Sequence, residues 1–345
     1  MKVLLTGTQG ADVNHEHWKS PRSKYKLVWC QTSLVNCMRA MGIEVDNRAV
    51  IPGEDLSEYD HVIVGVFDFA NGLQAHMYGA LYALGSRPDA KILITDWKTP
   101  AIIKKNYTKP LEELEPKLFR EFMYDRTKYS EEAIEHKDTI MNGFVDILDR
   151  THLMSMFNGG DLSYIPDAPK NCVTWNPEAH NISPFERITS NLFPVTKERR
   201  WTIAGIAKAP MSKADKISDD FSWPIDIYGN PKHVEGAVKV TEVEVIESYE
   251  RNLLCFYPDQ GNYGSGWWRN RPRQCADMGC VLYIPDAKEA SLFGPSYVGH
   301  TIESLEAMTT NELIDLANQQ RADYYESNPL DKEAQELQVS IALNV

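Results

Sequence analysis

The sequence lacks the features that mark exported, membrane-spanning and zinc-binding proteins. Its first ten residues hold one short apolar run, Val3 to Leu5, which is too short for the apolar part of a signal peptide. No apolar run approaches the roughly 18 residues that a membrane-spanning helix requires. The six cysteines include no CxxC pair, and no histidine follows them at zinc-finger spacing. We therefore expect a soluble, cytoplasmic protein that contacts no membrane, has no dedicated metal site and keeps its cysteines reduced.

Positive charge is also scarce, because 36 Lys and Arg stand against 49 Asp and Glu, a formal net charge of -13 at pH 7. The acidity is concentrated late in the chain: residues 1–200 hold 24 basic and 27 acidic residues, whereas 201–345 hold 12 and 22. Such a surface repels phosphates, which excludes a protein that coats nucleic acid through bulk electrostatics. The length of 345 residues and the 43% of hydrophobic residues favour two ordinary globular domains.

Short apolar runs alternate with helical patterns along the chain. KVLLTG near the N-terminus is typical of a buried parallel strand, and the apolar residues of 25–41 recur at helical spacing before Gly42. Further strands are expected at 61–67, 91–96, 152–157, 201–206, 224–230, 252–259 and 280–286, and further helices at 72–85, 131–148, 212–221, 272–278, 309–325 and 331–342. This alternation predicts parallel sheets that are covered on both faces.

A stretch rich in Gly, Pro, Asn and Ser, residues 158–194, separates two such alternations and is expected to hold the domain boundary. The sequence therefore predicts an α/β protein of two Rossmann-like, doubly wound domains, 1–180 and 181–330, that face a central cleft. The C-terminal helix within 331–345 is expected to pack back on the first domain. In open α/β sheets, ligands bind outside the carboxyl ends of the strands, so we expect the chemistry there.

Asp96 ends the expected strand at 91–96, in ITDWKTP, where a carboxylate is suited to act as a general base in the cleft. The alternative is a structural role, because Asp after a strand often accepts backbone N–H groups in a turn or a helix cap. A segment with lysines and no acid follows at 97–109, and it contains Lys98, Lys104, Lys105 and Lys109. This segment is either solvated surface or a contact for the phosphates of a polyanionic acceptor.

In the second half, Gly205, Lys208 and Lys213 lie around the turn that follows the strand at 201–206. Backbone N–H groups and cations at such a turn commonly bind phosphate, which makes the three residues candidates for donor binding. Because no GxGxxG or Walker pattern is present, an ordinary strand-to-helix turn explains them equally well.

The most unusual part of the sequence is residues 259–284, which combine glycines, aromatic residues and arginines. Pro272 is tolerated in the first turn of a helix, which places Arg271 in the N-cap region and Gln274 near the third helical position. A helix N-terminus with Arg271 forms an anion site, and Gln274 can bond sugar hydroxyls. The alternative is that the arginines of this segment pair with the many acids of this half.

Four stretches give the chain a resemblance to the DNA β-glucosyltransferases of T-even bacteriophages, a family with the two-domain GT-B architecture. They are KVLLTG with the helix that ends in AMGIEVD, LITDWKTP, TIAGIAKAPMSKADK leading to IYGN, and NYGSGWWRNRPRQCADMGCVLYI. By this resemblance, Asp96 is the base that deprotonates the acceptor hydroxyl. The spacing of Tyr263, Arg271 and Gln274 is similar to that of the family's tyrosine, arginine and glutamate that hold the nucleotide, and the third stretch is similar to its diphosphate loop.

Some positions depart from the family's pattern. Gln274 stands where the family has a carboxylate that bonds the ribose, so one carbonyl acceptor replaces two oxygens. Ala207 and Ala209 stand where the family has Ser and Arg, which leaves Lys208 and Lys213 to supply the positive charge. The sugar-recognising positions are not carried over, so glucose, arabinose and other sugars stay open.

The resemblance implies an inverting glycosyltransferase that moves a sugar from a nucleotide-diphosphate donor, such as UDP-glucose or UDP-arabinose, to a hydroxymethylated base in double-stranded phage DNA, for example 5-hydroxymethylcytosine. The protein would then act as a monomer in the host cell cytoplasm, and Mg²⁺ can assist the diphosphate leaving group, although no metal-ligand cluster stands out. Two alternatives stay open. One is a GT-B transferase for a small-molecule, lipid or protein acceptor, which the acidic charge favours, and the other is a non-enzymatic nucleotide-binding module.

Overall fold

The computed structural model describes residues 1–7, 29–65, 77–94, 128–143, 145, 147–156, 162–165, 167–176, 179–180, 196–206, 221–229, 236–238, 240, 242–257 and 270–345. Contacts divide the chain into two compact units: unit 1 comprises Met1–Asn181 and Asp331–Val345, and unit 2 comprises Ile182–Leu330. Each unit is built on its own parallel sheet, so the α/β class and the two Rossmann-like halves expected from the sequence are confirmed.

Unit 1 contains a six-stranded sheet in the order β2-β1-β3-β4-β5-β6, with every neighbouring pair parallel. The strands are β1 (Lys2–Thr6), β2 (Glu44–Asn47), β3 (His61–Gly65), β4 (Lys91–Ile94), β5 (His152–Ser155) and β6 (Cys172–Trp175). All residues of β4 and β5 are buried, and β1 and β3 are buried apart from their first residues. Their continuous apolar runs therefore reflect a sheet that is covered on both faces.

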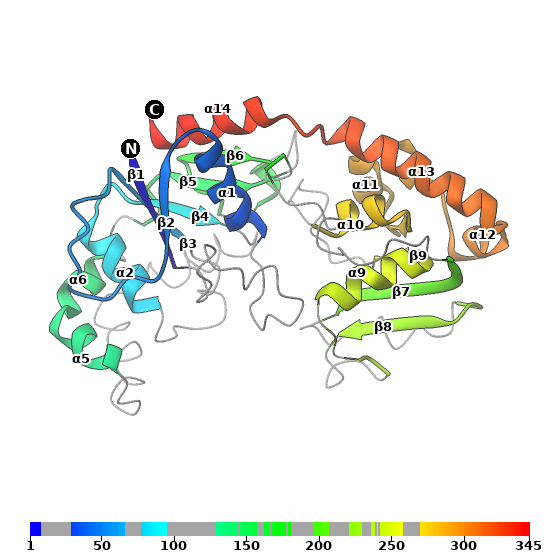
Figure 1. Cartoon of the computed structure of the whole chain (residues 1–345), viewed down its shortest axis with the longest axis horizontal. Coiled ribbons are helices and arrows are strands. Elements are labelled where there is room, and N and C mark those ends of the chain that lie inside the picture. Colours follow the sequence, from blue (N-terminus) through cyan, green and yellow to red (C-terminus); the bar gives the residue numbers. More distant parts are fainter. Residues whose placement is uncertain are drawn as a thin grey trace. The chain divides into compact units, whose positions relative to one another are not determined.

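The helices of unit 1 are α1 (Trp29–Ala40), α2 (Met77–Ser86), α5 (Lys128–Glu135), α6 (Lys137–Asn142) and the C-terminal α14 (Lys332–Leu343), with a short 3₁₀ turn, η3 (Leu162–Tyr164). Gly42 follows α1 with φ +78°, the left-handed conformation in which glycine commonly ends a helix. Although α14 is last in the sequence, it packs against α1 and β6 (Figure 1). The carboxylate of Asp331 caps α14 by accepting from the backbone N–H of Ala334 at 2.9 Å.

Unit 2 contains a four-stranded parallel sheet in the order β10-β9-β7-β8. The strands are β7 (Glu198–Ile206), β8 (Ile225–Gly229), β9 (Asn252–Phe256) and β10 (Val281–Tyr283), and the helices are α9 (Glu242–Arg251), α10 (Asn270–Met278), α11 (Ala287–Ala290), α12 (Ile302–Ala307) and α13 (Thr310–Ser327), with 3₁₀ turns η6 (Ser291–Phe293) and η7 (Pro295–Tyr297). Trp201, Phe256 and Leu313 are among the buried residues of its core. Burial of such side chains is the main favourable term in forming the unit.

Several elements differ from the sequence-based expectation. Strands β2 and β6 and helix α9 were not predicted, because β2 (EVDN) and β6 (CVTW) are short and partly polar, and half of the residues of α9 (EVEVIESYER) are charged. The helix expected over 131–148 is two short helices, α5 and α6, which are separated at His136. The helix expected at 212–221 lies, except for its last residue, outside the described residues.

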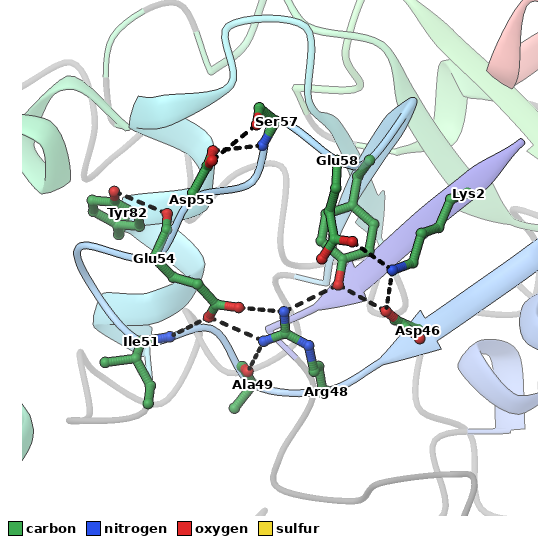
Figure 2. Close-up of polar contacts among 11 residues, drawn as sticks. Lys2, Asp46, Arg48, Ala49, Ile51, Glu54, Asp55, Ser57, Glu58 and Tyr82 are labelled. Atoms are coloured by element: carbon green, nitrogen blue, oxygen red, sulfur yellow. Dashed lines mark hydrogen bonds and ion pairs between the residues drawn. The ribbon is translucent and has the colours of Figure 1, made fainter.

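A network of charged side chains joins β1, β2 and the segment that follows β2 (Figure 2). The Nζ of Lys2 lies 3.4 Å from a carboxylate oxygen of Asp46. The hydroxyl of Tyr59 donates to Asp46 at 2.7 Å and accepts from Arg48 at 3.0 Å. Arg48 also donates to both carboxylate oxygens of Glu54. Because these charges are paired with each other, we assign the network to the stability of the sheet edge and not to catalysis.

The described helices include none that is both long and apolar enough to cross a membrane.

Candidate functional site

In each sheet the strand order reverses at one place, and α/β proteins commonly bind ligands at such a place. In unit 1 the chain moves from β1 to β2 on one side and to β3 on the other, and in unit 2 it moves from β7 to β8 on one side and to β9 on the other. At such a switch point the connecting segments leave in opposite directions and leave room outside the carboxyl ends of the strands. The candidate sites of the two units are therefore the carboxyl ends of β1 and β3 and of β7 and β9.

In unit 1 two glycines meet at the switch point. Gly7 follows β1 with φ +77°, and a Cβ atom built on it would lie 2.4 Å from the carbonyl oxygen of Gly65, the last residue of β3. Only glycine allows this backbone conformation and this approach together. The fully buried hydroxyls of Thr6 and Ser155, at the ends of β1 and β5, have no hydrogen-bond partner among the described residues. This edge therefore combines a close approach of two backbone segments with unpaired hydroxyl groups.

The predicted catalytic base and the basic segment of unit 1 cannot be placed beside this edge. Strand β4 ends at Ile94, and Asp96 lies outside the described residues. The same holds for the acceptor-binding candidates Lys98, Lys104, Lys105 and Lys109. Their roles stay predictions that rest on the sequence and its resemblance.

In unit 2, Gly205 lies inside β7 and not in the loop after it. The register of β7 against β8 shifts between Ala204 and Ile206, which makes Gly205 the irregular residue of the strand. An extra residue of this kind bends a strand and is common next to active sites, and glycine fits it well. The strand ends at Ile206, as expected, so only the assignment of Gly205 to the turn after it is corrected. Lys208, Lys213 and Tyr263 lie outside the described residues.

Helix α10 follows β9 and brings Arg271 and Gln274 to the carboxyl end of the sheet. The helix begins at Asn270, so Arg271 lies in its first turn and not at the N-cap, and Gln274 is the fifth residue and not the third. Pro272 fits in the first turn because the N–H groups there have no partner within the helix. The unpaired N–H groups and the helix dipole make this end of α10 favourable for an anion.

The guanidinium of Arg271 is held by aromatic residues. It lies over the ring of Tyr257, 4.3 Å from the ring centre, and it interacts electrostatically with the buried Tyr249 of α9. Arg271 lowers the pKa of the Tyr249 hydroxyl, but neither that hydroxyl nor the buried Nη1 of Arg271 has a hydrogen bond of normal geometry within the described part of the chain. Burial lowers the pKa of Arg271, but Tyr249, Tyr257 and two neighbouring cysteines raise it, so the pKa is raised overall. Arg271 is therefore a permanent cation with an unused donor.

Gln274 supplies a second unused donor one turn further along α10. The residue is 4% exposed, and its Nε2 atom has no partner among the residues that the structure describes. Buried amide groups are nearly always hydrogen-bonded in folded proteins, so the unpaired Nε2 calls for a partner that the described residues do not supply. Arg271 and Gln274 are i, i+3 neighbours and thus lie on the same face of the helix.

Arg273 of the same helix behaves differently and shows what a structural arginine looks like here. It forms an ion pair with Asp277, with a Nε to Oδ2 distance of 3.6 Å, and the hydroxyl of Tyr325 donates to the same carboxylate. The sequence-based alternative, in which the arginines of this segment pair with acids, therefore holds for Arg273. Arg271 has no such ion pair with a described carboxylate.

Lys197 connects the two helices that carry Tyr249 and Arg271. Its Nζ donates to the carbonyl oxygens of Glu250 at 2.8 Å, Met278 at 2.8 Å and Tyr249 at 3.2 Å. One ammonium group thus satisfies carbonyls at the ends of both α9 and α10, where a cation is also favoured by the helix dipole. Sequence reasoning did not find Tyr249 or Tyr257, because only the fold brings them to Arg271, and Lys197 lies at the other end of α10.

The described residues contain no group of three or more His, Cys, Asp or Glu side chains that could hold a metal ion. The site derived from Arg271 and Gln274 offers cationic and amide donors, which suit an anion and not a metal.

Two parallel Rossmann-like units of this kind define the GT-B class of fold. Among solved structures, the chain is similar to T4 phage BGT in complex with its UDP-glucose substrate, at 12% identity and a TM-score of 0.57, and to T4 phage BGT with UDP and Mn²⁺, at 13% and 0.61. It is also similar to a T4 phage β-glucosyltransferase structure that addresses substrate binding and mechanism, at 12% and 0.61. Each match covers 100% of both chains. No family model and no curated protein sequence matches the chain.

Proposed function

We propose that the protein is an inverting glycosyltransferase that uses a nucleotide-diphosphate sugar, with a UDP-sugar as donor. The observation that carries this proposal is the pair of buried, unpartnered donor atoms on α10, Arg271 Nη1 and Gln274 Nε2, at the ligand-binding end of a parallel sheet. A nucleotide diphosphate offers the negative charge and the oxygen acceptors that these two groups lack. The GT-B fold shared with T4 phage BGT, which has been solved with UDP-glucose, supports the same class of ligand.

In the proposed reaction, unit 2 binds the donor and unit 1 supplies the acceptor site. The carboxylate of Asp96 takes the proton of the acceptor hydroxyl while its oxygen forms a bond to C1 of the sugar. The bond between C1 and the diphosphate oxygen breaks at the same time, and UDP leaves with the electron pair. Arg271, with Lys208, Lys213 and the backbone near Gly205, stabilises the growing negative charge, and Tyr263 and Gln274 hold the nucleoside. No step is assigned to a metal.

For the acceptor, we propose a hydroxymethylated base in double-stranded DNA. Lys98, Lys104, Lys105 and Lys109 provide a segment without acids that can contact phosphates while the acidic remainder is repelled. A base in a duplex must leave the stack before its hydroxymethyl group can react. The net charge of -13 favours a second candidate, a small-molecule, lipid or protein acceptor. The two candidates differ in whether the sugar is transferred to DNA.

Two experiments test the proposal separately for donor and acceptor. Isothermal titration with UDP, UDP-glucose and UDP-arabinose should show binding to the wild-type protein, and the absence of binding for every nucleotide sugar would reject the donor class. A transfer assay with radiolabelled donor and hydroxymethylcytosine DNA should then label the DNA. Asp96→Asn should abolish labelling while the affinity for UDP stays unchanged. Labelling that survives this substitution would show that another group is the base.

A further inference from the structure

Tyr257 is placed by the backbone of the sheet, immediately after β9. Its N–H donates to the carbonyl oxygen of Tyr283 at 2.9 Å, which continues the parallel pairing of β9 with β10 by one residue. The side chain is 3% exposed, so the ring is fixed by packing as well as by its backbone. An aromatic ring held in this way is a rigid surface at the carboxyl end of the sheet.

The guanidinium of Arg271 packs on this ring. The centre of its guanidinium lies 4.3 Å from the centre of the Tyr257 ring, well within the distance of a cation–π interaction. Tyr249, which is fully buried in the last turn of α9, interacts with the same charge. An arginine normally reaches a fixed orientation through a bidentate carboxylate, and here two phenols replace it.

We propose that Tyr257 is a positioning residue for the donor: its ring orients the guanidinium of Arg271 so that the unpaired Nη1 is presented to the diphosphate. The inference rests on the proposed function, because it takes the diphosphate as the ligand of Arg271. A carboxylate in place of the ring would neutralise Arg271 and compete with the diphosphate. The ring orients the cation and leaves its full charge available to the ligand.

The inference predicts a particular pattern of affinities. Tyr257→Phe retains the ring and should bind UDP within about twofold of wild type. Tyr257→Leu removes the ring and should weaken UDP binding about five- to tenfold, as expected for the loss of one cation–π contact. Uridine lacks phosphates, so its affinity should be the same for both variants and the wild type. If Tyr257 had only a structural role, its loss would weaken the binding of UDP and of uridine together.

Phe256→Leu is the matched control. Phe256 is the preceding residue, is 8% exposed and packs edge to face on Phe221 with a centroid distance of 5.4 Å. Because successive residues of a strand point to opposite faces, the control removes a ring from the same backbone on the other side of the sheet. It should lower the melting temperature while UDP affinity stays at the wild-type value.

Phenylalanine analogues with increasing ring fluorination at position 257 provide a test that does not depend on how well Tyr257→Leu folds. They keep the shape of the ring while weakening its attraction for a cation, so UDP affinity should fall stepwise with fluorination and uridine affinity should not. UDP affinity that is independent of both fluorination and Tyr257→Leu would overturn the positioning role alone. A wild-type protein that binds no UDP would instead overturn the proposed donor, and the inference with it.

Discussion

Replacing Arg271 by methionine should separate stability from ligand binding in this protein. The buried Nη1 of Arg271 has no acceptor among the described residues, and leaving a buried donor unpaired costs about 1–3 kcal/mol. Methionine removes that cost and keeps much of the apolar stem, but it loses the contact with Tyr257, which is worth about 0.5–2 kcal/mol. These terms nearly cancel, so the free energy of unfolding of Arg271→Met should lie within about 2 kcal/mol of wild type in either direction.

Arg273→Met is the control on the same helix. Arg273 is ion-paired with Asp277, and both side chains are almost fully buried, with 7% and 6% exposed. Removing one partner of a buried pair leaves the other charge uncompensated and costs about 3–5 kcal/mol. We expect the lower end of this range, because the hydroxyl of Tyr325 continues to donate to Asp277. Arg273→Met should therefore be clearly less stable than Arg271→Met.

Urea denaturation of both variants, with UDP titrations on each, measures the two effects. Arg271→Met should lose roughly tenfold to a hundredfold in UDP affinity, since a hydrogen bond to a charged group is worth about 1.5–3 kcal/mol. The folded fraction of Arg273→Met should bind UDP with the wild-type affinity. The reasoning is refuted if Arg271→Met is destabilised as much as Arg273→Met while it binds UDP normally, because Arg271 would then be a structural arginine.

Three further substitutions test single features of the structure. Lys197→Met leaves three carbonyl oxygens without their shared donor and should lower the free energy of unfolding by about 2–4 kcal/mol, measured in urea; an unchanged midpoint would show that water replaces the ammonium. Tyr59→Phe should cost about 1–2 kcal/mol at pH 7. The Tyr59 hydroxyl lowers the pKa of Asp46 in the folded state. The stability difference between Tyr59→Phe and wild type should therefore be complete above the ordinary aspartate pKa of about 3.9 and shrink as the pH falls below it. A stability difference that does not depend on pH would contradict the assignment. Gln274→Leu should be at least as stable as wild type but bind UDP about five- to twentyfold more weakly, and unchanged UDP affinity would remove Gln274 from the site.

The fold class was accessible from the sequence because the main strands are buried on both faces. A parallel strand buried on both faces is mostly apolar, so β1, β3 and β4 stand out as nearly continuous apolar runs between polar loops. Strand β2 was missed for the opposite reason, since Glu44–Asn47 lies at the edge of the sheet and carries polar side chains. The hydrophobic pattern of such a short, polar edge strand does not differ from that of a loop.

The candidate site was only partly accessible. Arg271 and Gln274 were selected from their places near Pro272 and from the family resemblance, and the structure places both on the first turns of α10. The aromatic support of Arg271 was not predicted, because Tyr249 and Tyr257 belong to other elements and have no distinctive spacing from it. The roles of Asp96 and the lysines after it continue to rest on the sequence.

The amino-acid order by itself determined the buried central strands and most of the long helices, because these follow from local hydrophobic periods and from residues such as Gly42 that end them. Only the tertiary structure decided which side chains meet. The order of strands in each sheet, the bulge at Gly205 and the contact of Arg271 with the ring of Tyr257 all depend on packing between distant segments. Arg273 pairs with Asp277 four residues along the same helix, whereas only packing brings the ring of Tyr257 to Arg271.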